Sequence, residues 1–337
     1  MGMNGAIVPG LFRTRNRPNG RDERIRCYFS PMAKEFTLLT SSQAAGLLQV
    51  HESSVKRWTN EGVLRPIKTK GGHRRISLPG LLEFARAERA DATLLGLAPF
   101  EEDVARAALA ARERNDFHPL AELVIRLCDT KPPSYLVKAL RYLESACGVP
   151  LTRSFDLGIG ESMRRIGAEW TSGVRTIGRE HRFTQKILDA LYGLRNVETD
   201  ATAVTAPLAI VGCAETSYHE IGAMFVRLAL EGAGWQVCYL GSNVPFEEFA
   251  SIQEELNARL IAISFVPPCG NADVKRCLSV LAARYRAEKP YAVALGGGGI
   301  DPDAVEPMRK VFLSAKTWKS TEALSAWAKA QARSRPD

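Results

Sequence analysis

The sequence predicts a multidomain α plus α/β protein: a winged helix-turn-helix, then a helical bundle, then a Rossmann-like, doubly wound parallel sheet. Three observations predict this order. Residues 36–95 hold two short helical patterns and a cation-rich hairpin, residues 98–200 keep helical apolar periodicity, and residues 204–330 alternate short apolar runs with helical ones. The 337 residues, 45% of them hydrophobic, are enough for two or three packed cores.

The first 35 residues form a basic extension without apolar periodicity. Arg, Asn, Gly and Pro dominate residues 1–31, a composition that predicts disorder. Two interpretations remain open: a basic arm that adds phosphate contacts, or an upstream extension with Met32 as the natural start.

The next segment has the pattern of two short helices and a hairpin. Thr40 or Ser41 is expected to cap a helix over Ser42–Leu48, and Ser53 or Ser54 to cap a second over residues 53–61. The Gly-turned run from Lys68 to Ile76 predicts a hairpin wing. This is the order of a helix-turn-helix that docks on DNA.

Positive charge is concentrated at this end of the chain. Residues 1–35 carry a net charge of +4 and residues 36–80 carry +5, against +8 for the whole chain. Cations beside a recognition helix favour contacts with phosphates, so double-stranded operator DNA is the predicted partner. The candidate DNA contacts are Ser54, Lys56, Arg57, Lys68, Lys70, His73, Arg74 and Arg75.

The motifs of this segment resemble those of a known family. Thr40-x-x-x-Ala-Ala, Ser54-x-x-Arg-Trp-x-x-Glu-Gly and Gly71-Gly-His-Arg-Arg are similar to the winged helix-turn-helix of MerR-type regulators. The long coiled coil that usually follows in that family is missing, so dimerisation must be arranged differently.

The middle of the chain predicts an antiparallel helical bundle. Apolar residues recur at helical spacing between turns that contain Pro or Gly. The expected helices are Glu101–Arg114, Pro119–Cys128, Ser134–Ala146, Leu151–Trp170 and Ile177–Leu194.

The last third predicts parallel strands joined by helices. Strands are expected over residues 208–211, 236–240, 260–265 and 291–295, and helices over 221–232, 246–258 and 273–288. Loops with His219, with Ser264 and with four glycines from Gly296 follow three of the strands. Because the carboxyl ends of parallel strands share one sheet edge, these loops predict a pocket for a large planar ligand.

The same loops resemble the cobalamin-binding domain of methionine synthase and corrinoid proteins. His219-x-x-Gly222, Ser264-x-Val266 and Gly296-Gly297 carry the resemblance, which implies that His219 is the lower cobalt ligand and that Ser264 and the glycines surround the nucleotide tail. Where that family has Asp or Glu two residues before the His, this chain has Ser217, and the nearest carboxylate is Glu215. The group that would orient the imidazole is therefore missing or comes from elsewhere.

The bundle adds a second resemblance, to light-sensing cobalamin repressors of the CarH/LitR type. Trp170, nine intervening residues and then Glu180-His181 are similar to their bundle motif. That resemblance implies adenosylcobalamin as cofactor, with Trp170 against the adenosyl group and His181 as a metal ligand after photolysis. The residues expected to bind the cofactor are Trp170, Glu180, His181, Ser217, His219, Gly222, Ser264, Val266, Gly296 and Gly297, with His219 and His181 on the metal.

These observations predict a light-responsive repressor rather than an enzyme. It is expected to oligomerise on its operator in the dark, as a dimer or tetramer, and to release the DNA after cobalt–carbon photolysis. Two alternatives remain: a regulator of the same fold that senses another chromophore, the cobalamin level or an antirepressor protein, and a corrinoid methyltransferase component. No apolar run is long enough for a membrane span, and seven scattered cysteines without a CxxC pair favour a reducing cytoplasm and argue against a zinc site.

Overall fold

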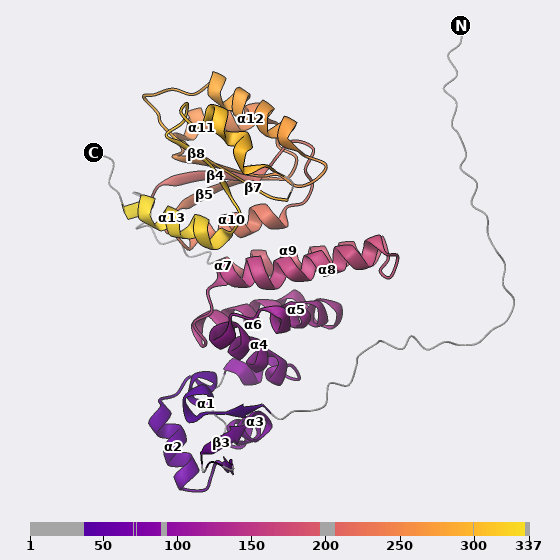
Figure 1. The fold of residues 1–337 in the computed structure, drawn as a ribbon, viewed down its shortest axis with the longest axis vertical. Coiled ribbons are helices and arrows are strands. Elements are labelled where there is room, and N and C mark those ends of the chain that lie inside the picture. Colours follow the sequence, from indigo (N-terminus) through magenta and orange to yellow (C-terminus); the bar gives the residue numbers. More distant parts are fainter. Residues whose placement is uncertain are drawn as a thin grey trace, which may run out of the picture. The chain divides into compact units, whose positions relative to one another are not determined.

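The computed structural model describes residues 37–69, 71, 73–88, 93–195, 206–298 and 300–333 (Figure 1). The predictions for the basic extension, for Met32 and for Lys70 lie outside the described residues. Within that part of the chain, no helix is both long and apolar enough to cross a lipid bilayer.

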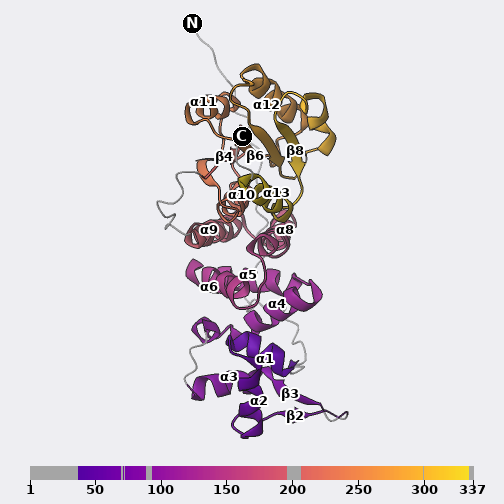
Figure 2. The same cartoon turned by 90° about the vertical axis from the view of Figure 1, so that its left-hand side faces the viewer.

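The first folded region is the predicted winged helix-turn-helix. Its elements are β1 (Leu38–Leu39), α1 (Ser41–Leu48), α2 (Glu52–Asn60), β2 (Ile67–Lys68), β3 (Arg74–Ser77) and α3 (Leu78–Ala87). The strands pair antiparallel in the order β1-β3-β2, and the β2 and β3 hairpin is the wing (Figure 2). Helix α3 was not predicted; it packs Phe84 against Trp58, with ring centroids 4.9 Å apart.

The caps of the two leading helices differ in how well the sequence predicted them. Thr40 caps α1 as expected and forms a reciprocal capping box with Gln43. The predicted cap of α2 by Ser53 or Ser54 is wrong. His51 has the extended backbone of a cap and accepts the Ser53 amide at 3.3 Å, because the helix begins earlier than the serines indicated.

The bundle follows the predicted helices with one irregularity. Its elements are η1 (Thr93–Leu97), α4 (Glu101–Arg114), α5 (His118–Thr130), α6 (Pro133–Ser145), α7 (Leu151–Arg153), η2 (Ser154–Ile159), α8 (Gly160–Thr171) and α9 (Ile177–Leu194). The single helix predicted over residues 151–170 contains a π-helical turn, η2. A Cβ on Gly158 would lie 2.6 Å from Leu120, so this turn brings backbone very close to α5.

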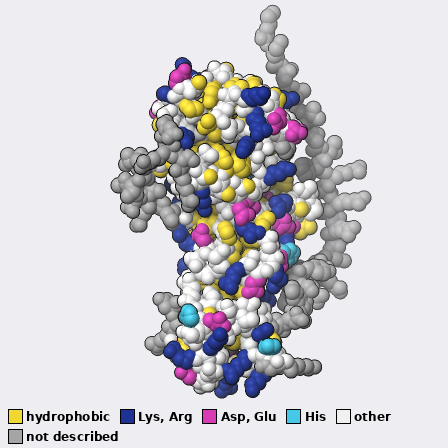
Figure 3. Space-filling model, turned by 60° about the vertical axis from the view of Figure 1, so that its left-hand side comes forward, with side chains coloured by type: hydrophobic (Ala, Val, Ile, Leu, Met, Phe, Trp, Pro, Cys, Tyr) yellow, Lys and Arg dark blue, Asp and Glu magenta, His cyan; other side chains and the backbone are white. Residues whose placement is uncertain are grey.

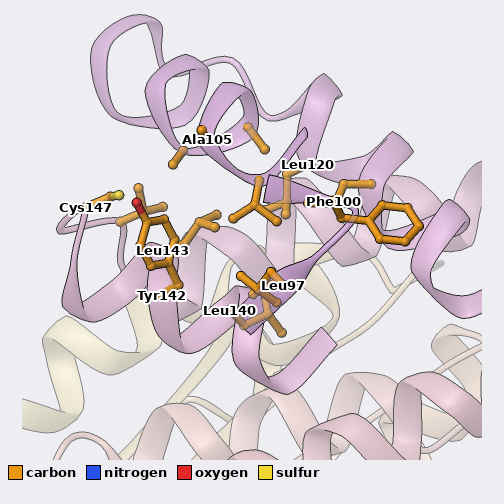
Figure 4. Packing of buried hydrophobic residues seen from close by; sticks show 14 of the residues in the cluster. Leu97, Phe100, Ala105, Leu120, Leu140, Tyr142, Leu143 and Cys147 are labelled. Carbon is orange, nitrogen blue, oxygen red and sulfur yellow. The ribbon is translucent and has the colours of Figure 1, made fainter. Parts of the chain in front are cut away.

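Buried leucines and one tyrosine form the bundle core (Figure 4). Tyr142 on α6 is fully buried, and its hydroxyl donates to the Leu47 carbonyl of α1 at 2.7 Å. Arg86 on α3 pairs with the buried Glu101 of α4 at 2.8 Å. One hydrophobic cluster runs from β1 through the bundle to α10, so the helix-turn-helix packs directly on the bundle.

The last region is the predicted parallel sheet with helices on both faces. The strands are β4 (Leu208–Cys213), β5 (Gln236–Gly241), β6 (Leu260–Ser264), β7 (Ala292–Gly296) and β8 (Ser314–Trp318), in the order β5-β4-β6-β7-β8. One face carries α10 (Ile221–Glu231) and α13 (Thr321–Arg333), and the other carries α11 (Phe246–Leu256) and α12 (Asn271–Ala283) (Figure 1).

Two features of this region were not predicted from the sequence. The first is strand β8 with helix α13 and the short helix η4 (Pro302–Met308) before them. The second is the end of helix α12 at Ala283 rather than at residue 288. Tyr285 turns inward there and packs on Tyr291 and Phe312, with centroids 5.1 and 5.4 Å away.

The bundle contacts the sheet region through the π turn. Phe155 stacks on Phe225 of α10, with centroids 5.0 Å apart and ring planes 4° apart. The next residue, Asp156, accepts the amides of Thr321 at 2.8 Å and Glu322 at 3.4 Å. These are the first amides of α13, which have no partner within their own helix, so a carboxylate from the bundle caps a helix of the sheet region.

Burial changes the pKa of the Asp156 carboxylate, which caps α13. Desolvation raises the pKa of Asp156 above its ordinary value, and the hydrogen bonds from Thr321 and Glu322 offset that shift only in part. Because the folded-state pKa is raised, the contribution of Asp156 to stability is full below its unfolded pKa and declines as pH rises through the folded pKa.

Two substitutions at Asp156 separate the hydrogen bonds from the charge. Asp156→Ala leaves both amides without an acceptor and should lower the free energy of unfolding by about 0.5–2 kcal/mol, the usual effect of removing a helix cap. Asp156→Asn keeps an oxygen acceptor and removes the charge, so its stability relative to wild type should increase between about pH 4 and about pH 7. Chemical denaturation at several pH values measures both effects.

Asp116→Asn is the matched control, because Asp116 accepts the His118 amide at an exposed position. If the difference in free energy of unfolding between wild type and Asp156→Asn stays constant across this pH range, desolvation of the Asp156 carboxylate does not determine its contribution to stability.

Candidate functional site

Three loops meet at the carboxyl edge of the sheet, as the sequence predicted. The register aligns Cys213 of β4 with Ser264 of β6, Ser264 with Gly296 of β7, and Gly296 with Trp318 of β8. The loops that follow β4, β6 and β7 are therefore neighbours in space. His219, Val266 and Gly297 lie in these loops.

Below this edge is a cavity of about 150 Å³, between the sheet and helices α10 and α13. Four of its lining residues are predicted site residues, namely Gly222, Ser264, Gly296 and Gly297. Most of the remaining wall is apolar, with Val211, Ala262, Ala294 and Leu295 from the strands. The cavity is thus a narrow, largely apolar slot with a serine hydroxyl in its wall.

One glycine is required by a close backbone contact. Gly297 has φ +120°, and a Cβ there would lie 1.8 Å from the Phe265 carbonyl oxygen, so a side chain would displace the loop after β6. A Cβ on Gly222 would lie 3.0 Å from the Ser264 hydroxyl oxygen and would press on the cavity wall.

His219 is exposed at the same edge and is unrestrained. Its ring makes no hydrogen bond or ion pair to any residue that the structure describes. Glu215 lies 2.7 Å from Arg276, in an ion pair without hydrogen-bond alignment. Glu220 accepts from Tyr239 at 3.4 Å. Neither nearby carboxylate therefore orients His219.

Ser217 occupies the position of the missing carboxylate and points inward. It is fully buried, and its hydroxyl oxygen has no hydrogen-bond partner among the described residues. An Asp or Glu at this position would have to bury a charge, which is costly without a paired cation. The loop is thus built around a small residue at position 217.

In the bundle, unlike in the loop that carries His219, a carboxylate orients the candidate histidine. Glu180 accepts from Thr184 at 2.7 Å and holds Nδ1 of His181 at 2.6 Å. Since the His181 side chain is 71% exposed, Nε2 remains accessible. This is the carboxylate–imidazole arrangement that raises ligand basicity at metal sites. Trp170, at the end of α8, is 48% exposed, although large apolar side chains are usually buried.

Sequence reasoning missed most of the cavity wall, including Asp156, Trp318 and Thr321. Trp318 ends β8, and Lys319 and Ser320 lead to Thr321, the first residue of α13. Ser320 and Thr321 directly before a helical pattern are a local signal for a helix start. Asp156 had no local signal, because its role depends on a partner 165 residues away.

The slot fits a flat, mainly apolar group such as the nucleotide tail of a cobalamin, and the glycines keep it open. His219 lies in the loop after β4, at the same sheet edge, but does not line the slot. The described residues contain no cluster of three or more His, Cys, Asp or Glu that could hold a bare metal ion. His219 and His181 each offer a single exposed imidazole.

The second candidate surface is the wing with helix α2. Lys56, Arg57, Lys68, His73 and Arg74 are exposed, whereas Ser54 and Arg75 are half-buried. Lys and Arg side chains gather at the lower end of the view in Figure 3, over this region.

Three of these cations have local partners, among them Arg75, which donates to the Arg74 carbonyl oxygen at 3.3 Å. Arg74 donates to the Asn60 side chain at the end of α2, which ties the wing to that helix. Lys56 pairs with Glu52 at 2.9 Å. Arg57 and Lys68 have no acidic partner within the described part of the chain.

Two family models match the chain in these two regions. A helix-turn-helix domain matches residues 38–89, and a B12 binding domain matches residues 207–314. The first range includes the wing and α2, and the second includes the His219, Ser264 and glycine loops.

Curated relatives agree with this combination. The chain is 30% identical over 156 residues to the HTH-type transcriptional repressor CarA of Myxococcus xanthus, covering 46% of this chain and 51% of the relative. It is 25% identical over 161 residues to the repressor CarH of the same organism, covering 46% and 50%. Dimethylamine corrinoid protein 1 of Methanosarcina mazei is 34% identical over 109 residues, covering 31% and 50%.

The chain thus spans about half the length of the curated relatives it matches. Two of them are repressors, which agrees with the prediction of a regulator rather than an enzyme. The chain joins a helix-turn-helix domain to a B12-binding domain through a helical bundle, and it is similar to the repressors CarA and CarH over about half of its length.

Proposed function

We propose that this protein is a light-responsive transcriptional repressor that binds adenosylcobalamin between its bundle and its sheet. In the dark it oligomerises on operator DNA, as a dimer or tetramer, and illumination releases it. The observation that carries this proposal is His181, an exposed imidazole held by Glu180 on a bundle that packs against the B12-binding domain. The similarity to CarA and CarH supports it.

The residues of the sheet would hold the lower side of the cofactor. Gly222, Ser264, Gly296 and Gly297 surround the slot that suits the nucleotide tail, with Val266 in the loop beside it. His219 would bind the cobalt from the side of the sheet. Its lack of an orienting carboxylate makes its imidazole a weaker donor than one paired with Asp or Glu.

The residues of the bundle would face the upper side. When bound, adenosylcobalamin would supply a light-sensitive cobalt–carbon bond. Trp170 offers an exposed indole that would pack on the adenosyl group, and His181 offers Nε2, which would bind the cobalt after illumination. The two residues lie on consecutive helices, α8 and α9, so both move with the bundle.

The link from cofactor to DNA is the packed chain of contacts described above. The helix-turn-helix is fixed to the bundle by Tyr142 and by the Arg86 and Glu101 pair, and the bundle is fixed to the sheet by Asp156. A change in the bundle would therefore be passed to the helix-turn-helix through these contacts. Several wings on one operator would bind far more tightly than one, so dissociation of the oligomer releases the DNA.

We assign domain limits of 36–95, 98–200 and 204–330 to the three functions, with the basic extension before them, and we place the protein in the cytoplasm. Ser54, Lys56, Arg57, Lys68, Lys70, His73, Arg74 and Arg75 are the proposed DNA contacts.

A second candidate is a regulator of the same fold that responds to the cobalamin level, another chromophore or an antirepressor protein. The buried Ser217 and the unsupported His219 favour it, because they depart from the pattern of a tightly held lower ligand. A corrinoid methyltransferase component is less well supported, since a DNA-binding domain has no role in methyl transfer.

The wing can be tested through the salt dependence of operator binding. Arg74→Ala combined with Arg75→Ala should weaken binding and lower the slope of log K against log salt by about 1 for each phosphate that these arginines neutralise. Fluorescence anisotropy at several salt concentrations measures the slope. Arg286→Ala removes an exposed cation after α12 and serves as control. An unchanged slope in the wing variant would place the wing away from DNA.

The switch can be tested with two bundle variants in the dark and after illumination. Trp170→Ala should lower the affinity for adenosylcobalamin by at least about 2 kcal/mol and weaken the dark oligomer, because it removes the indole that fills the site. His181→Ala should keep the dark oligomer and dark operator binding, and its illuminated form should lack the histidine-ligated spectrum. Size-exclusion chromatography with absorption detection follows both properties.

His118→Ala controls for removal of an exposed bundle histidine, because His118 lies at the start of α5. Identical elution of the loaded wild-type protein in dark and light would contradict the light response and favour the second candidate.

A further inference from the structure

A second cavity, of about 230 Å³, lies at the amino edge of the sheet, opposite the edge that carries His219. It is lined by residues at the starts of strands, including Arg259 directly before β6 and Ser314 at the start of β8, and by Trp327 and Gln331 of α13. None of the proposed cobalamin or DNA contacts lines it. The cavity therefore has no part in the function proposed above.

One wall of this cavity is aromatic and rigid. Trp235 and Trp327 have ring planes 22° apart and centroids separated by 6.3 Å. The indole N–H of Trp235 donates to the Ala328 carbonyl at 2.9 Å, which fixes its ring. Trp327 is half-buried and also packs on Trp318, with centroids 5.7 Å apart. Partly exposed indole surface on a fixed support favours stacking of a planar group.

The charged residues of the lining are both cations. Arg259 and Lys316 both line the cavity, and neither has a carboxylate partner among the described residues. The Lys316 ammonium group lies 5.9 Å from the Trp318 ring centroid, and it contacts no other charged or aromatic group in the part of the chain that is described. The eight lining residues include no Asp or Glu.

Two cations without a counter-charge at one small cavity favour an anion, and Arg259 can bind a carboxylate or phosphate through two parallel hydrogen bonds. Ser314 and Gln331 add neutral hydrogen-bonding groups at the same place.

We propose that this cavity binds a small aromatic anion, with the ring against Trp327 and the anionic group held by Arg259 and Lys316. The chemistry requires a planar ring that carries a carboxylate or a phosphate. An aromatic carboxylic acid and a nucleoside monophosphate both satisfy it, and binding measurements distinguish them.

Isothermal titration calorimetry of the full chain tests the proposal with adenosine 5′-monophosphate and indole-3-carboxylate as probes. Adenosine and inorganic phosphate are the half-molecules, lacking the anion and the ring. At least one probe should bind, and both half-molecules should bind at least about tenfold more weakly, since charge-assisted hydrogen bonds and stacking each contribute. The probe that binds more tightly shows whether the ligand is a nucleoside monophosphate or an aromatic carboxylic acid.

Arg259→Gln and Lys316→Gln should each weaken binding of that probe by about tenfold. Lys275→Gln is the matched control, because Lys275 is an exposed cation on α12, on the opposite face of the sheet. The affinity of Lys275→Gln for the probe should equal that of wild type, with or without bound cobalamin.

Absence of binding by both probes at millimolar concentration would overturn the proposal. So would binding of adenosine as tight as that of a monophosphate that does bind, or unchanged affinity in both the Arg259 and Lys316 variants.

Discussion

The contact of the π-helical turn with helices α10 and α13 is the interaction on which the rest of the structure depends. Phe155 stacks on α10, and Asp156 caps α13. The same Asp156 also lines the cavity at the carboxyl edge, so one short segment both joins two regions and completes a binding site. The two neighbouring side chains thus contact two different helices of the sheet region.

The two candidate cobalt ligands differ in how the protein supports them. His181 is held by Glu180, whereas His219 stands in a loop whose carboxylates are occupied by Arg276 and Tyr239. A held imidazole loses less conformational freedom on binding a metal than a free one does. His181 is thus better oriented than His219 to bind cobalt. This agrees with a proposed light response that begins on the bundle side of the cofactor.

Local sequence patterns were enough to predict most elements and their order. Apolar periodicity placed α4 and α9 at their observed bounds, and the strands β4 to β7 within two residues at each end. The His219, Ser264 and glycine loops could be placed at one edge because parallel strands share a direction, and the register agrees.

What the sequence did not reveal depends on distant partners. Asp156 acts on residues far along the chain, and the inward turn of Tyr285 that ends α12 depends on Tyr291 and Phe312. At the π turn Gly158 lies very close to Leu120. Apolar periodicity in the sequence cannot predict such a contact. Burial of Ser217 and occupation of Glu215 by Arg276 likewise depend on the folded chain, although both residues stand out in the sequence.

Binding of adenosylcobalamin at the carboxyl edge, with His219 beneath the cobalt, is central to the proposed function. The most direct measurement is the absorption spectrum of protein incubated with adenosylcobalamin in the dark and then separated from free cofactor, for wild type and for His219→Ala. Wild type should retain the cofactor, and the variant should retain less and show a shifted spectrum, because the axial imidazole is absent. Retention of no cobalamin by wild type, or identical retention and spectra for the two proteins, would contradict the account.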